Sequence, residues 1–364
     1  MSDKKIDKKI RVLVVDDSAL MRKLLPQILQ RDKTIEVVGT AMDGTFGLKK
    51  IEELRPDVIT LDLEMPRMDG TEMLRQIMRT RKIPVIVVSA YSTAGAAATF
   101  KALAMGAFDF VAKPRDSAQD HMEEIANELI SKIKVAAKAG SDRWLGKSFP
   151  ANGDLKPPLK PAVRYKGAAS RIIAIGSSTG GPNTLQYLLS QLPGDFAGAM
   201  VVVQHMPEGF TEMFAKRLDE SCALEVKEAE SGELLTAGKV LICPGSRHIR
   251  VRRMQQGDMV VLSNEPPVNG HRPSVDLLFR SVAQELGPSA IAILMTGMGD
   301  DGADALGVVR AAGGFTIAQS EESCVVFGMP KAAIDKGFVS RVVPLESMAN
   351  TLMVHCSVGA VSEK

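Results

Sequence analysis

The sequence predicts two α/β domains, each built around a mostly parallel sheet. The chain has 364 residues, of which 45% are hydrophobic, so it can form two cores of ordinary size. Short apolar runs alternate with helical patterns five times in the first part of the chain, and the alternation resumes after a proline-rich break. Strict alternation of strand and helix is typical of doubly wound parallel sheets.

The first domain is expected at residues 8–137. Its strands are expected at residues 10–15, 35–40, 58–63, 85–89 and 109–112. Its helices are expected at residues 19–30, 44–54, 70–79, 94–105 and 118–137. Because right-handed crossovers join parallel strands, the carboxyl ends of these strands should lie together along one edge of the sheet.

The segment 138–168 interrupts this alternation. It holds four prolines and many small or charged residues without apolar periodicity, which favours a linker. The composition is compatible with a passive tether and with an element that docks onto a domain.

The second domain is expected at residues 169–358. Its strands are expected at residues 172–175, 200–203, 223–227, 240–243, 249–253, 259–263, 291–295, 315–318 and 339–342. Its helices are expected at residues 183–191, 209–221, 275–286, 302–312 and 329–336. The runs on either side of residues 255–258 predict an antiparallel hairpin. This domain is therefore expected to be a doubly wound, mostly parallel α/β fold with some antiparallel strands.

The composition argues against several classes of protein. There are 45 basic and 43 acidic residues, a net charge of +2, so the chain lacks the excess of positive charge that is typical of nucleic-acid-binding domains. It has no apolar run long enough for a membrane helix, and its charged N-terminus has no signal-peptide pattern, which predicts a cytoplasmic protein without membrane insertion. The four scattered cysteines form no CxxC pair, so neither a disulfide framework nor a zinc site is expected.

Polar residues mark the strand ends of the first domain. Asp16 and Asp17 follow the first expected strand, Asp62 ends the third, Ser89 the fourth, and Lys113 follows the fifth. Three carboxylates held close together repel one another and call for a cation, and an oxygen-rich site of this kind suits Mg²⁺. The serine hydroxyl and the lysine ammonium are suited to hold the oxygens of a phosphoryl group. The pattern predicts a magnesium and phosphoryl site at this edge.

The second domain opens with a strand that runs into the loop GSSTGG at residues 176–181. Such a loop can present a nucleophilic serine on a strand-to-helix turn, or it can cradle a phosphate with backbone N–H groups. A phosphate loop would be expected to carry Rossmann spacing or a GK[ST] ending, and neither is present.

A serine nucleophile requires a base and an orienting acid at neighbouring strand ends. His205 follows the second strand of this domain, and Asp301 follows the strand at residues 291–295. We therefore predict Ser178, His205 and Asp301 as nucleophile, base and acid, with the Met298 amide as an oxyanion-hole donor. The alternative for one of the two aspartates, at 300 and 301, is to cap the following helix.

The strand-end residues of the first domain resemble the receiver domain of two-component response regulators, over residues 10–135. The resemblance implies a flavodoxin-like five-stranded sheet with Asp62 as the phosphoacceptor, and a histidine kinase as phosphodonor. It further implies metal ligation by Asp16, Asp17, Asp62 and the backbone carbonyl of Glu64, a phosphate-sensing pair at Ser89 and Lys113, and Phe110 as the switch aromatic.

The second domain resembles the chemotaxis protein-glutamate methylesterase (CheB) family, over about residues 168–345. The resemblance rests on SSTGG at 177–181, QHMPEGF at 204–210, CPGSRHI at 243–249, HRPSVDLLF at 271–279, TGMGDDGA at 296–303 and SCVVFGMP at 323–330. It implies the same triad, Ser178, His205 and Asp301. Thr179, His271 and Arg272 are candidates for the lining of a substrate groove. One departure is Ser177, where alanine is common, which adds a second candidate nucleophile.

For function, the resemblance implies hydrolysis of glutamate γ-methyl esters and deamidation of glutamines on methyl-accepting chemotaxis receptors. The esterase reaction would need no cofactor, and phosphorylation of the first domain would relieve hindrance of the active site by that domain. Two alternatives remain open on the sequence alone. One is a receiver with a DNA-binding output, and the other is a regulatory module whose glycine loop binds a nucleotide or serves as a non-catalytic scaffold.

Overall fold

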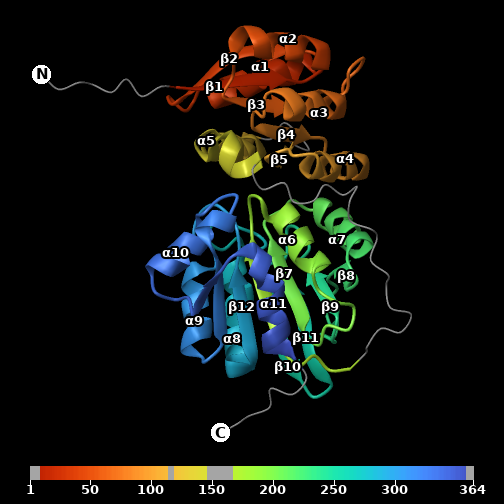
Figure 1. The fold of residues 1–364 in the computed structure, drawn as a ribbon, viewed down its shortest axis with the longest axis vertical. Coiled ribbons are helices and arrows are strands. Elements are labelled where there is room, and N and C mark those ends of the chain that lie inside the picture. The colour runs from red at the N-terminus through yellow and green to blue at the C-terminus, as the bar shows by residue number, and fades with distance from the viewer. Residues whose placement is uncertain (1–8, 114–118, 146–166, 358–364) are drawn as a thin grey trace, which may run out of the picture. The chain divides into compact units, whose positions relative to one another are not determined.

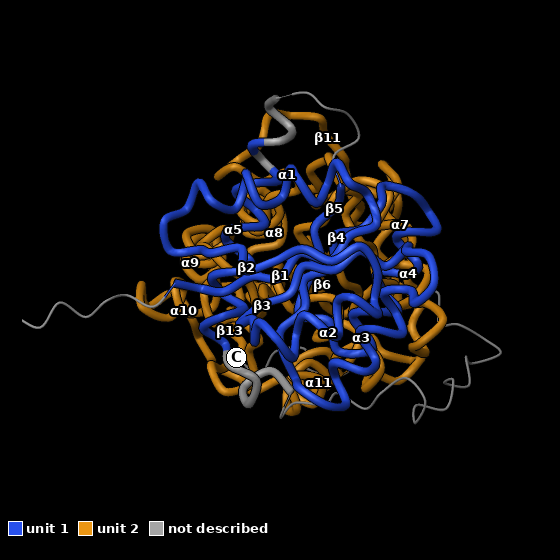
Figure 2. Tube along the Cα trace, turned by 90° about the horizontal axis from the view of Figure 1, so that it is seen from above, with its two compact units in different colours: residues 1–151 blue, residues 152–364 orange. Residues whose placement is uncertain are grey.

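The structure is a computed structural model that describes residues 9–113, 119–145 and 167–357. The chain divides into two compact units, residues 1–151 and 152–364 (Figure 2). Among the described residues, none of the helices combines the length and the apolar character that a membrane crossing requires.

The first unit is a five-stranded parallel sheet with the order β2-β1-β3-β4-β5, flanked by helices (Figure 1). The strands are β1 (Ile10–Val15), β2 (Ile35–Ala41), β3 (Val58–Leu61), β4 (Val85–Ser89) and β5 (Asp109–Ala112). The helices are α1 (Ala19–Leu29), α2 (Gly44–Leu54), α3 (Gly70–Thr80), α4 (Thr93–Ala104) and α5 (Gln119–Leu145). The predicted alternation and the parallel sheet are confirmed.

Local sequence explains where these elements begin. The side chains of Ser18, Asp43, Asp69 and Ser92 each accept a hydrogen bond from a backbone amide in the first turn of α1 to α4. Every residue of β3, β4 and β5 is buried, as expected for parallel strands that are covered on both faces.

The second unit has a seven-stranded parallel sheet with the order β14-β13-β12-β6-β7-β9-β8, and a separate antiparallel pair, β10-β11. Its strands are β6 (Ile172–Ser177), β7 (Ala199–Gln204), β8 (Glu225–Glu228), β9 (Lys239–Ile242), β10 (His248–Met254), β11 (Gly257–Ser263), β12 (Ala290–Leu294), β13 (Phe315–Gln319) and β14 (Arg341–Val343). Its helices are α6 (Gly181–Ser190), α7 (Phe210–Ser221), α8 (Val275–Leu286), α9 (Ala303–Ala311), α10 (Met329–Asp335) and α11 (Leu345–Cys356), with short 3₁₀ turns η1 (Gly287–Ser289) and η2 (Glu321–Ser323). The mostly parallel fold with an antiparallel pair is confirmed.

Two helices differ from expectation. Residues 138–145, expected to belong to the linker, continue α5. No proline interrupts this stretch, since the first proline after α5 begins is Pro150. The rest of the expected linker, residues 146–166, lies outside the described residues. The final helix, α11, was not predicted at all, although its buried residues Leu345, Met348, Leu352 and Cys356 follow a helical period.

The strand order places three carboxyl ends side by side. Strand β6 lies between β7 and β12, with Ser177 opposite Gln204 on one side and Gly176 opposite Leu294 on the other. The loops after these three strands carry the predicted triad. In doubly wound sheets, this edge is where ligands and catalytic groups collect.

Candidate active site

The two serines of the glycine-rich loop have different environments. Ser177 is the last residue of β6 and is fully buried, and its hydroxyl donates a hydrogen bond to Gln204 Oε1 over 2.7 Å. Ser178 is half-buried, and its amide donates to the carbonyl of Thr296 over 3.0 Å. The hydroxyl of Ser177 is thus engaged inside the protein, which leaves Ser178 as the serine of the loop that can meet a substrate.

Glycines let the surrounding backbone come close to this serine. Gly180 has a φ of +78° and precedes α6, in a conformation that residues with a Cβ rarely adopt. A Cβ on Gly181 would lie 1.9 Å from Gln204 Oε1, and one on Gly297 would lie 2.9 Å from Ser178 Cβ. The turn after β12, which contains Gly297 and Met298, therefore packs directly against Ser178.

His205 occupies the position after β7 that matches Ser178 after β6. Its amide donates to the Ser177 carbonyl over 3.0 Å, and Gln204 Nε2 donates to the carbonyls of both Ser178 and His205, over 2.9 and 3.1 Å. The ring lies 2.9 Å from Asp301 Oδ2 through Nε2 and stacks on His271, with centroids 4.0 Å apart.

The hydrogen bond to Asp301 assigns the tautomer of His205. An ionised carboxylate can only accept, so Nε2 carries the proton and Nδ1 carries the lone pair. Nδ1 is buried and has no hydrogen-bond partner within the described part of the chain. The imidazole therefore keeps one nitrogen, Nδ1, whose lone pair is available to accept a hydrogen bond.

Asp301 is held by a set of converging donors, which include the first two amides of α8. It is 1% exposed and accepts hydrogen bonds from the Val275 amide over 2.7 Å and the Ser274 hydroxyl over 2.9 Å. Burial disfavours its charge, but the bonds from His205, Val275 and Ser274 outweigh burial and lower the pKa of Asp301 to about 2. It is ionised at neutral pH.

The capping role that the sequence left open for Asp301 falls to another residue. Helix α9 begins after Gly302, which provides no side-chain cap. Asp276, from α8, accepts hydrogen bonds from the Gly302 and Ala305 amides over 3.0 and 3.3 Å. Asp300 is exposed. The helix terminus is therefore satisfied without the carboxylate that binds His205.

A second histidine, His248, forms hydrogen bonds with the segment that holds Asp301. His248 is completely buried, its Nε2 donates to the Pro266 carbonyl over 3.1 Å, and its Nδ1 accepts from the Ser274 amide over 3.2 Å. Burial lowers the pKa of His248, which favours the neutral ring that this bonding requires. Sequence reasoning missed Ser274 and His248, because nothing in the local pattern links them to Asp301.

The other predicted site residues lie at varying distances from this centre. Thr179 is 3% exposed, and its carbonyl accepts from the Thr296 hydroxyl over 3.0 Å. His271 contacts the triad through its stacking on His205. Arg272 is exposed and donates to the Glu265 carbonyl over 3.3 Å, so this hydrogen bond leads away from the triad.

The acidic residues of the first unit also come together. Oxygens of Asp16, Asp17 and Asp62 lie within 4.8 Å of one another, and Lys113 Nζ lies 3.0 Å from Asp16 and 2.6 Å from Asp62. Burial raises the pKa of Asp62, against the effect of Lys113. The Glu64 amide donates to Asp62 Oδ1 over 3.2 Å. Hard oxygen ligands at this spacing fit Mg²⁺.

The other two predicted receiver residues are buried beside this site. The Ser89 hydroxyl donates to the Gly95 carbonyl over 3.0 Å, at the start of α4. Phe110 is 3% exposed and packs edge-on against Phe100, with Lys132 over its ring. Ser89 thus connects the end of β4 with the adjoining helix.

Comparison with known proteins covers both units. A family model described as CheB methylesterase matches residues 173–352, and a response regulator receiver domain model matches residues 12–126. A relative from Koribacter versatilis, named protein-glutamate methylesterase/protein-glutamine glutaminase 2, is 63% identical over 97% of this chain and 98% of its own length. A relative of the same name from Hahella chejuensis is 46% identical over 95% of this chain and 96% of its own length.

A solved structure matches the second unit. The CheB methylesterase catalytic domain of Thermotoga maritima is 40% identical with a TM-score of 0.50, and the match covers 51% of this chain and 99% of that domain. Relatives of this identity and coverage establish the family for both units together. The chain belongs to the CheB methylesterase family, with a response regulator receiver domain ahead of its methylesterase domain.

Proposed function

We propose that this protein is a protein-glutamate methylesterase and protein-glutamine glutaminase that uses Ser178, His205 and Asp301 as its triad. The observation that carries the triad is the oriented imidazole: His205 is bonded to Asp301 through Nε2 and keeps a buried, unpartnered Nδ1 within the described residues. Family membership supplies the reaction, because both relatives carry this double name. The substrates are glutamate γ-methyl esters and specific glutamines on methyl-accepting chemotaxis receptors.

The chemistry is acyl transfer through a serine ester. Ser178 Oγ attacks the ester carbonyl while His205 Nδ1 takes the hydroxyl proton. The carbon–oxygen bond to the leaving group then breaks, and the imidazolium returns the proton so that methanol departs; with a glutamine substrate, ammonia departs instead. Water, deprotonated by the same nitrogen, hydrolyses the acyl-enzyme and restores Ser178.

Two groups stabilise the charges that develop. Asp301 is ionised and 2.9 Å from the ring, so it balances the imidazolium during each proton transfer. The Met298 amide is the proposed donor to the oxyanion, because its turn packs against Ser178 at Gly297. Neither the formation nor the hydrolysis of the acyl-enzyme uses a cofactor.

A matched pair of serine variants tests the nucleophile. The assay is methanol release from receptor membranes that carry methylated glutamates. Ser178→Ala should abolish release above background. Ser177→Ala should keep substantial activity, because that hydroxyl bonds to Gln204 in the interior. Loss of activity in Ser177→Ala with retention in Ser178→Ala would contradict the assignment.

We further propose that the receiver controls this activity. Asp62 would accept a phosphoryl group from the chemotaxis histidine kinase, with Mg²⁺ held by Asp16, Asp17, Asp62 and the Glu64 carbonyl. The ion would neutralise charge on the transferring group. Ser89 and Lys113 would bind the new phosphoryl oxygens, and Phe110 would respond to the movement of Ser89.

In the unphosphorylated state, the receiver would hinder access to Ser178, and phosphorylation would relieve that hindrance. We also propose a cytoplasmic location for the protein, with the chemotaxis receptors and the histidine kinase as its partners. Asp62→Asn separates control from catalysis: it should keep basal methanol release and lose the increase caused by a small phosphodonor. A donor response that survives in Asp62→Asn would contradict control through this residue.

A further inference from the structure

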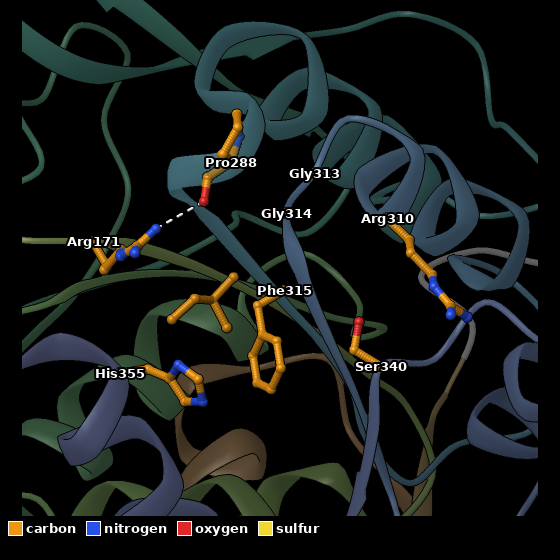
Figure 3. Close-up of a pocket in the computed structure, with 9 residues that line it drawn as sticks. Arg171, Pro288, Arg310, Gly313, Gly314, Phe315, Ser340 and His355 are labelled. Carbon is orange, nitrogen blue, oxygen red and sulfur yellow. Dashed lines mark hydrogen bonds between the residues drawn. The ribbon is translucent and has the colours of Figure 1, made fainter. Parts of the chain in front are cut away.

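A cavity of about 390 Å³ opens at the end of the second unit's sheet opposite the triad (Figure 3). Its lining residues lie at the amino ends of strands: Arg171 directly precedes β6, Ile291 is near the start of β12, and Phe315 begins β13. The triad follows the carboxyl ends of the same sheet. The cavity is therefore separate from the esterase site, and catalysis leaves it unexplained.

The cavity carries positive charge. This charge comes from Arg171 and Arg310, which line the cavity, and Figure 3 shows the two arginines on opposite sides of Phe315. Within residues 9–113, 119–145 and 167–357, neither arginine forms an ion pair with a carboxylate. Burial, followed by the positive charges of Arg171 and Arg341, lowers the pKa of His355, in keeping with a local excess of positive charge. An anion in the cavity would reduce this repulsion.

Backbone carbonyls hold both guanidinium groups at the rim. Arg171 Nη1 donates to the Pro288 carbonyl over 2.8 Å. Arg310 Nη1 donates to the carbonyls of Gly337 and Val339. A guanidinium has five N–H donors in a rigid plane, so these bonds orient each group and leave donors for a ligand. A preoriented arginine binds an anion at a lower cost in side-chain entropy.

One side of the cavity is apolar. Phe315 packs on the His355 ring with centroids 4.2 Å apart, and Pro288 and Ile291 complete this side. A bare inorganic ion would leave such a wall without a partner. The volume also falls within the range of about 300–1,000 Å³ that is usual for small-molecule sites.

We propose that this cavity binds a small organic anion. Its carboxylate or phosphate group is attracted by the positive charges of Arg171 and Arg310, and its planar or apolar body lies against Phe315. The two anionic groups share this chemistry, and the choice of probe separates them. This site is independent of the proposed esterase activity, since none of its residues belongs to the triad or to the loops that hold it.

Titration calorimetry on the full-length chain tests the site, with adenosine monophosphate and benzoate as anionic organic probes. Inorganic phosphate tests the anion alone, and adenosine tests the ring alone. At least one organic anion should bind, and more tightly than either inorganic phosphate or adenosine. Arg171→Gln and Arg310→Gln should each weaken that binding at least about tenfold, because a charge-assisted contact is lost. Arg252→Gln, an exposed arginine of β10, is the matched control and should change it less than about twofold.

Retained methanol release in the Arg171 and Arg310 variants shows that they are folded, so weaker binding then reports on the cavity itself. Three results would overturn the proposal: no binding of either organic anion at millimolar concentration, binding that neither variant changes, or an equal loss in Arg252→Gln. Binding unaffected by these variants would place the anion elsewhere, including at the glycine loop.

Discussion

Replacing Asp301 with asparagine isolates the charge of the acid from its shape. In the wild type, Oδ2 accepts from His205 and the Val275 amide over 2.9 and 2.7 Å. Oδ1 accepts from the Ser274 hydroxyl over 2.9 Å, and over the longer distances of 3.3 and 3.4 Å from the Asp276 amide and Asn269 Nδ2. An asparagine has one oxygen and one NH₂ group. Because a hydroxyl can accept as well as donate, the NH₂ group should take the Oδ1 side and face Ser274, and the oxygen should keep its short bonds to Val275 and His205. The imidazole tautomer would survive. The negative charge would be lost, together with the two long hydrogen bonds from Asp276 and Asn269.

The size of the effect follows from the charge pair. Two unit charges about 4 Å apart interact by roughly 4 kcal/mol at an effective dielectric constant of about 20. Asp301 exerts this stabilisation on the imidazolium of the transition state, so kcat for methanol release should fall by about 10³-fold, with KM nearly unchanged. Asp300→Asn, at the exposed neighbouring position, is the control and should remain within about twofold. A loss of less than about tenfold in Asp301→Asn would refute the role assigned to this charge.

The same variant makes a prediction about stability and pH. The pKa of Asp301 falls from 3.8 to about 2 on folding, which corresponds to roughly 2 kcal/mol of stabilisation at neutral pH. Because the folded-state pKa is the lower one, this contribution is present above about pH 4 and is lost as the pH falls towards 2. Urea unfolding should show wild type more stable than Asp301→Asn at pH 6, and the difference should shrink between pH 4 and 2. A difference that grows on acidification would contradict the assignment.

Two further variants test the scaffold of the site. Ser274→Ala removes the 2.9 Å hydrogen bond to Asp301 and should lower kcat by roughly tenfold with little change in KM. The reason is that a hydrogen bond to a charged group contributes about 1.5–3 kcal/mol. An unchanged kcat would show that Asp301 is positioned without this hydrogen bond. Gly181→Ala would place a Cβ 1.9 Å from Gln204 Oε1 and should destabilise the protein by about 1–3 kcal/mol in urea unfolding. Wild-type stability in this variant would show that the serine loop can move away from Gln204 at little cost in free energy.

The fold was predictable because it rests on local periodicity. Buried strands such as β3 and β4 are mostly apolar, and helices α2 and α3 begin at recognisable caps, Asp43 and Asp69. The end of α5 was harder to place, since small and charged residues suit both a helix and a linker. Sequence composition does not decide between them without the packing of the helix.

The candidate site was predictable only for residues that follow strands. Ser178 and His205 occupy matching positions after β6 and β7, and the parallel order of the sheet brings them together. The motif already favoured Ser178 over Ser177 on the sequence alone, and the bond from Ser177 to Gln204 across the strands supports that prediction. His248 and Ser274 were missed because their link to Asp301 runs through long-range hydrogen bonds.

Covalent labelling tests the central claim most directly, that Ser178 is a nucleophile activated by His205. The full-length chain is treated with a phosphonate ester that reacts with activated serines, and the modified peptide is located by mass spectrometry. The label should lie on Ser178, should be absent from Ser177, and should be lost in His205→Gln. Labelling of Ser177, or equal labelling of Ser178 in His205→Gln, would contradict the proposed triad.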